Sequence, residues 1–180
     1  MTPQDYEDFN LQWQREFFAP PFIALSACCT GYDSRDIVLR VCLMSAEGEV
    51  LLSSLIQPPK TKPIQKEWLD QLSCSKDELK NAPDYQSVRN QLKTFCKGKN
   101  VIVLSRWIMT VFDQTADRTG GNKLKIIMHD LHSIEYNVTK QPCEHLGFQS
   151  LIPAPESDAL AICGNIVERM QKLAAVVSTI

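Results

Sequence analysis

Three short apolar segments near the N-terminus constrain the fold of this chain more than any other feature. Residues 22–27 form an almost unbroken apolar run, which is typical of a strand covered on both faces. Residues 37–44 and 50–56 follow, and the polar stretch 45–49, which contains Gly48, joins them. A connection of this kind between two strand-like segments predicts a hairpin. The three segments together predict an antiparallel meander.

The spacing of apolar residues changes toward 3.6 after residue 63. Ile64, Trp68 and Leu72 would share one helical face, and a second helix is expected to begin after Asp84. We then expect a buried strand at 101–104, a helix from about 106 to 116, a strand at 124–128 and a long C-terminal helix. The apolar face of that last helix would contain Leu160, Cys163, Ile166, Val167, Met170, Leu173 and Val177. Strands that alternate with helices after a meander predict an α/β protein with a mixed five-stranded sheet and helices on both faces.

An aromatic stripe marks the N-terminus. Tyr6, Phe9, Trp13 and Phe17 recur at spacings of three and four, so they would lie on one face of a helix. The stripe either packs on the chain's own core or binds a protein partner, and the sequence leaves both alternatives open. We expect a helix within residues 1–20 that is appended to a single domain at 21–180, because 180 residues with 44% hydrophobic residues suit one core.

The charge balance bears on the partners of the chain, and its cysteines indicate a reducing compartment. The 19 basic and 21 acidic residues nearly cancel, so no global field draws the chain to nucleic acid or to an anionic membrane. No apolar run reaches the roughly 20 residues that span a bilayer, and the N-terminus lacks the pattern of a secretory signal. The seven cysteines are scattered, without a C-x-x-C pair, and are expected to be reduced. We therefore expect a cytoplasmic protein with no membrane partner.

Several pieces of the chain, in order, resemble one known family. Residues 30–33 read TGYD, residues 48–51 read GEVL before IQP at 56–58, and residues 79–85 read LKNAPDY before an apolar helix that ends in GK. The stretches IMHD at 127–130, LGF at 146–148 and SDA at 157–159 follow. These pieces resemble the DnaQ-like (DEDDh) 3′-to-5′ exonucleases of the ribonuclease H-like fold. The resemblance spans about residues 22–172 and implies the same sheet that the segment pattern predicts.

The resemblance also implies where a catalytic centre would lie. The family holds two divalent ions roughly 3.5 to 4 Å apart with four carboxylates, and a histidine is its general base. The first two carboxylate positions fall on Ser26 and Cys28, and the histidine position falls on Pro153. A neutral hydroxyl and a thiol cannot replace two charges on a hard ion such as Mg²⁺.

The third carboxylate position can be aligned in two registers, and the fourth in one. One register places Thr110 at the third position, and a shift of three residues places Asp113 there. The fourth position falls on Asp158, which also fits a helix N-terminus, where the helix dipole favours a carboxylate. Asp113 and Asp158 are therefore the only candidate metal ligands among the family positions.

Three functional hypotheses follow from this degenerate site. The first is a catalytically inactive exonuclease-fold protein, without a cofactor, that acts as a protein-interaction or regulatory module with a protein partner or as a homodimer. The second is a 3′-to-5′ exonuclease that uses Mg²⁺ or Mn²⁺ at a rearranged site built from Asp113 and Asp158. The third is a nucleic-acid-binding module without cleavage, with the candidate contacts Lys97, Lys99, Arg106 and Trp107. The missing carboxylates and histidine favour a protein that is not an enzyme.

Overall fold

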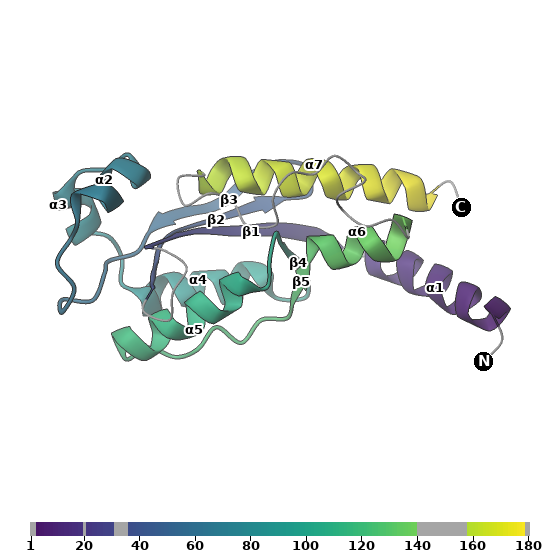
Figure 1. The fold of residues 1–180 in the computed structure, drawn as a ribbon, viewed down its shortest axis with the longest axis horizontal. Helices are drawn as coiled ribbons and strands as arrows, with labels where there is room; N and C mark the ends of the chain where they lie inside the picture. The colour runs from purple at the N-terminus through teal and green to yellow at the C-terminus, as the bar shows by residue number, and fades with distance from the viewer. Residues whose placement is uncertain (1–2, 20, 31–35, 140–157, 179–180) are drawn as a thin grey trace.

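A mixed five-stranded sheet with helices on both faces forms the centre of the structure (Figure 1). The computed structural model describes residues 3–19, 21–30, 36–139 and 158–178, with side chains from residue 11 onward. The strands are β1 (Phe22–Cys29), β2 (Val38–Ser45), β3 (Val50–Leu55), β4 (Asn100–Val103) and β5 (Met128–Asp130). The helices are α1 (Pro3–Phe18), α2 (Lys66–Leu72), α3 (Lys76–Lys80), α4 (Tyr85–Cys96), α5 (Trp107–Thr119), α6 (Leu131–Thr139) and α7 (Ala159–Ser178).

The strand order is β3-β2-β1-β4-β5. β1, β2 and β3 are antiparallel neighbours, whereas β1, β4 and β5 run parallel to one another. The hairpin between β2 and β3 is closed by a hydrogen bond from the Ser45 amide to the Glu49 carbonyl oxygen at 2.8 Å. Gly48 supplies the left-handed backbone conformation of this turn, with φ of +88°. The expected fold class, an antiparallel meander continued by parallel strands, is confirmed.

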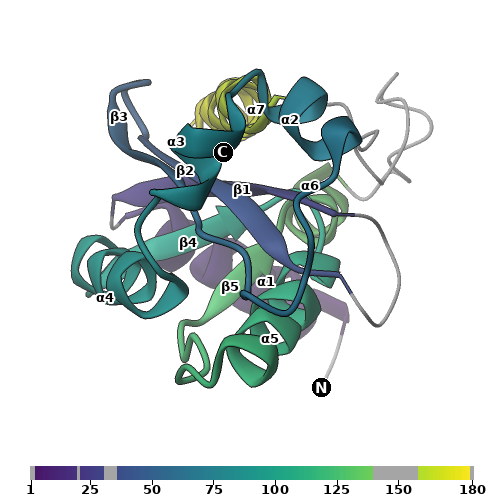
Figure 2. The same cartoon turned by 90° about the vertical axis from the view of Figure 1, so that its left-hand side faces the viewer.

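The two faces of the sheet carry separate apolar layers. Because successive side chains of a strand point to opposite faces, β1 directs Ala24 and Cys28 to one layer, and Ile23 and Leu25 to the other. α7 covers the first face together with α6, while α4 and α5 cover the second (Figures 1 and 2). The continuous apolar run of β1 therefore reflects a central strand that is buried on both sides.

Local signals explain where several helices begin and end. α4 begins after Asp84, whose carboxylate accepts a hydrogen bond from the Ser87 amide at 2.7 Å, as its start signal predicts. α5 extends three residues beyond the expected end and stops at Gly120, which has φ of +69°. α3 begins with a capping box of Ser75 and Glu78, a signal that the sequence analysis did not use.

Three details differ from the sequence prediction. The last strand is not 124–128 but the shorter β5, because only residues 128–130 pair with β4. Leu160 was expected on the buried face of the C-terminal helix, yet it is exposed, because the residues of α7 that face the sheet begin with Ala159 and Cys163. α6 was not predicted. None of the helices in the described ranges is both long and apolar enough to cross a membrane.

Candidate functional site

Ser26, on β1, is the first residue that the resemblance aligns with a metal-binding carboxylate. Its side chain is only 2% exposed, and its hydroxyl donates a hydrogen bond to the carbonyl oxygen of Ala159 at the start of α7. The thiol of Cys163, one turn further along α7, lies 3.3 Å from the same hydroxyl oxygen as a donor. The hydroxyl therefore donates and accepts within the protein, and it joins β1 to α7.

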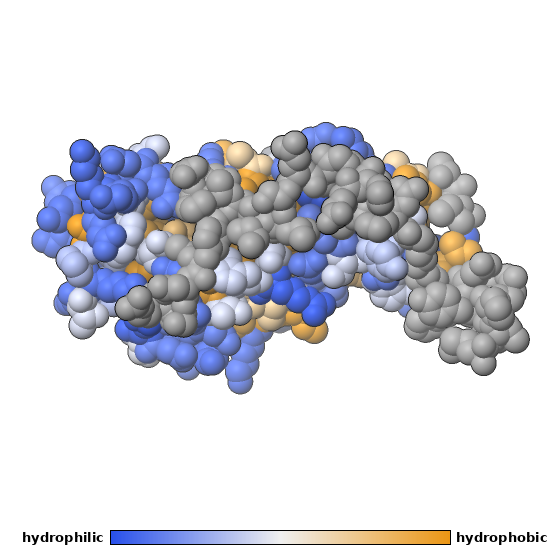
Figure 3. Space-filling view, in the orientation of Figure 1, coloured by the Kyte–Doolittle hydropathy of each residue, from blue (hydrophilic) through white to orange (hydrophobic). Residues whose placement is uncertain are grey.

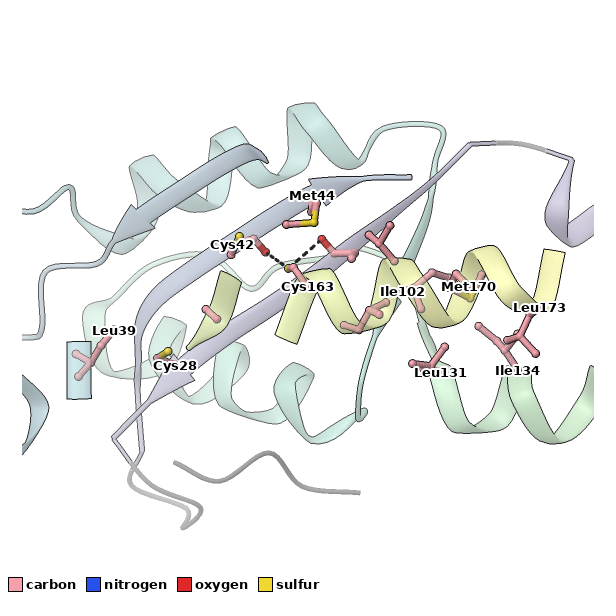
Figure 4. Close-up of a cluster of buried hydrophobic side chains, with 14 of the residues drawn as sticks. Cys28, Leu39, Cys42, Met44, Ile102, Leu131, Ile134, Cys163, Met170 and Leu173 are labelled. Carbon is pink, nitrogen blue, oxygen red and sulfur yellow. Dashed lines mark hydrogen bonds between the residues drawn. The ribbon is translucent and has the colours of Figure 1, made fainter. Parts of the chain in front are cut away.

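The thiols around Ser26 are also held in the interior. Cys163 Sγ lies 3.3 Å from the carbonyl oxygen of Cys42 and 3.6 Å from that of Ala24, so it bridges β1 and β2 (Figure 4). Hydrogen bonding with Cys42, together with burial, raises the pKa of Cys163. Burial likewise raises the pKa of Cys28, the residue at the second carboxylate position. Cys28 is therefore a neutral thiol near pH 7 and provides no charge for a hard cation.

A small, mostly apolar pocket lies beside Ser26. It has a volume of about 40 Å³ and opens between the ends of β1 and β4, the beginning of α5 and the first turns of α7. Besides Ser26, the side chains that fill this region are Leu104, Trp107, Ile108 and Ile162. A volume of this size admits a few water molecules at most, and its apolar lining offers them few partners.

The third carboxylate position remains outside this pocket in either register. Thr110 is exposed on α5, and Asp113 forms an ion pair with Lys123, with Asp113 Oδ2 3.4 Å from Lys123 Nζ. Asp113 also lies near Tyr85 of α4, on the α4–α5 side of the sheet, whereas Ser26 contacts α7 on the other side. The structure therefore does not bring Asp113 together with Ser26.

Asp158 stands at the beginning of α7 and has a structural role there. Its carboxylate accepts a hydrogen bond from the Leu160 amide at 3.1 Å, and its carbonyl oxygen accepts one from the Ile162 amide at 3.0 Å. Pro153 lies outside the described residues. Within those residues, no group of three or more His, Cys, Asp or Glu side chains is arranged to hold a metal ion. The donor set does not fit the two divalent ions that the resemblance implies.

Comparisons with known proteins identify the fold. No protein-family model matches the chain, and no curated protein matches its sequence. Among solved structures, the nuclease domain of 3′hExo, a DEDDh family member bound to rAMP, superposes with a TM-score of 0.66 at 11% identity, over 88% of this chain and 93% of that domain. A full-length 3′-exonuclease superposes with a TM-score of 0.65 at 12% identity, over 97% of this chain and 71% of that protein.

The chain has the fold of the DnaQ-like (DEDDh) 3′-to-5′ exonucleases. Exonuclease I of E. coli, in complex with a dA16 oligonucleotide, also superposes, with a TM-score of 0.59 at 12% identity over 89% of this chain. The chain spans 42% of that enzyme. At these identities the likeness establishes the fold, and the residues of the site must be judged from their own chemistry.

The exonuclease fold separates the four candidate nucleic-acid contacts into two pairs. Arg106 and Trp107 lie after β4, where Arg106 is exposed and Trp107 lines the small pocket. Lys97 and Lys99 lie before β4, at the opposite end of the strand. The backbone amide of Arg106 donates to Asp130 at 3.2 Å, which fixes the start of α5 beside β5. The four residues therefore do not form one surface.

The described part of the aromatic stripe packs on the core of the exonuclease fold. Phe17 is buried, stacks on Trp13 with ring centroids 5.1 Å apart and meets the edge of His129 at 4.9 Å. Asn100 donates a hydrogen bond to the Phe17 carbonyl oxygen at 2.8 Å, which ties α1 to β4. The side chains of Tyr6 and Phe9 are not described, so partner binding by these two residues stays a prediction.

The sequence analysis did not predict one buried charge pair. Arg169 of α7 and Glu135 of α6 are 6% and 1% exposed, and Arg169 Nε donates to Glu135 Oε1 at 2.6 Å. His132 Nδ1 lies 3.5 Å from the same carboxylate. Burial opposes the charged form of Glu135, but the hydrogen bonds from His132 and Arg169 outweigh it and lower its pKa. The signal was available, because Arg169 falls on the apolar face of its helix, three residues after Ile166.

Proposed function

We propose that this chain is a catalytically inactive member of the exonuclease fold that works by binding, as a protein-interaction or regulatory module. One observation carries the proposal: the Ser26 hydroxyl is hydrogen-bonded between Ala159 and Cys163, beside a pocket of about 40 Å³. Two-metal phosphodiester hydrolysis needs carboxylate oxygens for both ions and space for the phosphate. Hydrogen-bonded neutral groups and apolar side chains meet neither need.

The alternative of a rearranged exonuclease site rests on Asp113 and Asp158. Asp113 is paired with Lys123 on the α4–α5 side of the sheet, and Asp158 supports the first turn of α7. A cleaving site built from these two residues would have to release both from their present partners. We therefore rank this alternative below the inactive protein.

A nuclease assay tests the inactivity. Single-stranded DNA and RNA, labelled at either end, would be incubated with Mg²⁺ or Mn²⁺ and either the parent protein or Asp158→Ala purified in parallel. We expect no metal-dependent shortening of the substrate by either protein. Shortening by the parent that is absent with Asp158→Ala would overturn the proposal and establish a rearranged exonuclease.

A homodimer is the form of protein binding that the sheet supports. β3 is the terminal strand of the described sheet, and Val50 on it is 45% exposed. Exposed edge strands pair readily with strands of other chains. We expect light scattering after size-exclusion chromatography to show a dimer that Val50→Lys weakens. Val176→Lys on α7, at a residue 46% exposed, is the matched control and should leave the dimer intact. A parent protein that is monomeric at all concentrations contradicts this form of the proposal.

Binding of nucleic acid without cleavage is the second candidate function. Solved structures with the same fold were determined with rAMP, with a dA16 oligonucleotide and with a histone mRNA stem-loop. In this chain, Arg106 is exposed beside the small pocket and next to Trp107. A cation and an aromatic ring in this position could hold a phosphate and a base. Loss of oligonucleotide binding in Arg106→Gln would support contact at this end of the sheet.

A further inference from the structure

Basic residues are concentrated in one continuous part of the chain. Residues 85–129 contain eight Lys and Arg residues and only two acidic residues, although the whole chain has a net charge of −2. From residue 85 to residue 112 there is no Asp or Glu. This part forms α4, β4, α5 and the segment that leads to β5. Hydrophilic residues dominate the face visible over α5 in Figure 3.

A broad hollow lies within this basic part, at the beginning of β4. Its volume is about 630 Å³, and four lysines line it: Lys93, Lys97, Lys99 and Lys125. Lys97 and Lys99 flank Gly98, which has φ of +71°, in the turn that follows the end of α4 at Cys96. Lys125 reaches the hollow from the segment that leads to β5. We call this surface the lysine hollow.

Among the described residues, no acidic side chain pairs with these lysines. The residues that line the lysine hollow include no Asp or Glu, and none of its four lysines forms an ion pair with a carboxylate of the described residues. Other lysines of the chain do form such pairs, as Lys123 does with Asp113 and Lys172 does with Glu168. Four unbalanced ammonium groups around one concave surface attract a polyanion.

The rim of the hollow also offers an apolar contact. Ile127 is 79% exposed, the highest exposure among the large apolar side chains of the described residues, and it lines the hollow together with Lys125. The neighbouring Ile126 packs partly against the core, so the segment is anchored while Ile127 faces solvent. A ligand that combines repeated negative charge with flat apolar groups would use both features.

We propose that the lysine hollow binds a single-stranded nucleic acid, with lysines on successive phosphates and Ile127 against a base or sugar. A hollow of about 630 Å³ has room for one or two nucleotides of a flexible strand, while the wide, stiff body of a duplex would remain outside. An acidic peptide fits less well, because the lysines offer only donors and would leave the peptide's own N–H groups without acceptors.

This site is separate from the Ser26 region and goes beyond the function proposed above. β4 lies between them, and its four residues, at roughly 3.3 Å each, separate the two ends by about 13 Å. The lysine hollow would bind nucleic acid whether or not the chain cleaves it. It also makes use of Lys97 and Lys99 without Arg106 and Trp107, which lie at the other end of the strand.

Salt-dependent binding tests the proposal. Fluorescence anisotropy would follow labelled poly-dT and poly-U of about 20 nucleotides, in separate arms, against the parent protein. With four lysines on phosphates, the logarithm of the binding constant should fall with the logarithm of salt with a slope of about −3, which is roughly 50-fold between about 50 and 200 mM. Lys97→Gln/Lys125→Gln should reduce the slope to roughly half and weaken binding about 10-fold.

Matched variants locate the contact. Lys66→Gln/Lys76→Gln removes the same charge from exposed residues at the first positions of α2 and α3 and should bind like the parent. Lys97→Arg/Lys125→Arg keeps the charge and should bind within about twofold of the parent. Ile127→Ser should weaken binding roughly threefold without changing the salt slope, because it removes apolar contact only.

Other outcomes would overturn the proposal. No binding of either strand at about 50 mM salt would do so, as would an equal loss in the hollow and control double variants. Loss with Arg106→Gln alone would move the contact to the Ser26 end of the sheet. Tighter binding of a poly-Glu peptide or of a blunt duplex than of the single strands would assign the hollow to a different partner.

Discussion

The two ends of β4 differ in the side chains around them and in the size of the adjoining hollow. At the C-terminal end, next to the Ser26 position that the sequence resemblance aligns with a metal ligand, the chain has neutral hydrogen-bonded groups, apolar side chains and a pocket of about 40 Å³. At the N-terminal end, four lysines line a hollow of about 630 Å³, and the described lining includes no Asp or Glu. The comparison teaches that the charge and the large concave surface of this chain lie at the opposite end of β4 from the positions that the resemblance aligns with metal ligands.

The largest expected effect comes from placing a carboxylate at position 26, beside the C-terminal end of β4. Ser26→Asp would place a charge against the Ala159 carbonyl oxygen, beside a small and mostly apolar pocket that offers a carboxylate few hydrogen-bond donors. We expect a loss of about 4 kcal/mol in the free energy of unfolding, from the buried and unpaired charge. Urea denaturation measures this loss.

The pH dependence of that variant gives a second test. Burial would raise the pKa of the new carboxyl in the folded state above its unfolded value of about 3.9. The folded state would then bind more protons than the unfolded state, so the deficit should grow as the pH rises above about 4. Lys125→Asp in the lysine hollow should change stability by less than about 0.5 kcal/mol. A stable Ser26→Asp protein that gains Mn²⁺ binding would show that the region around position 26 can hold a metal ion.

The second effect concerns the charge pair that fastens α7, the helix that supplies Ala159 and Cys163. Glu135→Gln would leave the Arg169 guanidinium buried without its counterion, at a cost of roughly 3–4 kcal/mol. Replacement of both residues, as Glu135→Leu/Arg169→Met, should recover most of this loss. A double-mutant cycle from urea denaturation measures the coupling, and additive effects of the single variants would contradict it.

This pair also predicts acid sensitivity with a definite sign. The pKa of Glu135 is lowered in the folded state, so its stabilising contribution is complete above its unfolded pKa of about 4.3. The contribution is lost as the pH falls through the lowered folded value. The parent should therefore lose stability below about pH 4 more steeply than Glu135→Gln does.

Sequence patterns identified the sheet because its strands depend on short-range signals. The apolar run of β1, the Gly48 turn and the Asp84 helix start each act within a few residues, and each is present in the structure. The state of the Ser26 position was foreseen in part, since a hydroxyl there is visible in the sequence. Its hydrogen bonds to Ala159 and Cys163 were not, because these partners lie more than 130 residues away in the chain.

Long-range pairing likewise explains the remaining differences. β5 is short because pairing with β4, not the apolar content of residues 124–128, determines which residues form the strand. The lysine hollow joins Lys93, Lys97 and Lys99 to Lys125, and only the packing of the 125–127 segment beside α4 shows that they share a surface. The absence of acidic residues from 85 to 112 was a usable sign of it.

The third effect tests which way the N-terminal stripe packs. Phe17→Ala would remove a ring that is buried against Trp13 and His129, and we expect a loss of roughly 3 kcal/mol. Gln12→Ala, at an exposed residue of the same helix, should change stability by less than about 0.5 kcal/mol. Thermal unfolding followed by circular dichroism measures both. Equal stability of the two variants would contradict inward packing and favour a stripe available to a partner.

The smallest expected change in the free energy of unfolding concerns Asp158, and it tests whether this residue is a helix-start residue or a metal ligand. If its carboxylate only supports the first turn of α7, Asp158→Ala should cost about 1 kcal/mol, whereas Asp158→Asn, which keeps an acceptor for the Leu160 amide, should cost a few tenths. A metal ligand would behave differently, because asparagine lacks the charge that holds Mg²⁺ or Mn²⁺. Urea denaturation with and without Mn²⁺ separates the two roles. Stabilisation of the parent by Mn²⁺ that both variants lose equally would make Asp158 a ligand, and the C-terminal end of β4 would then have to be regarded as a working metal site.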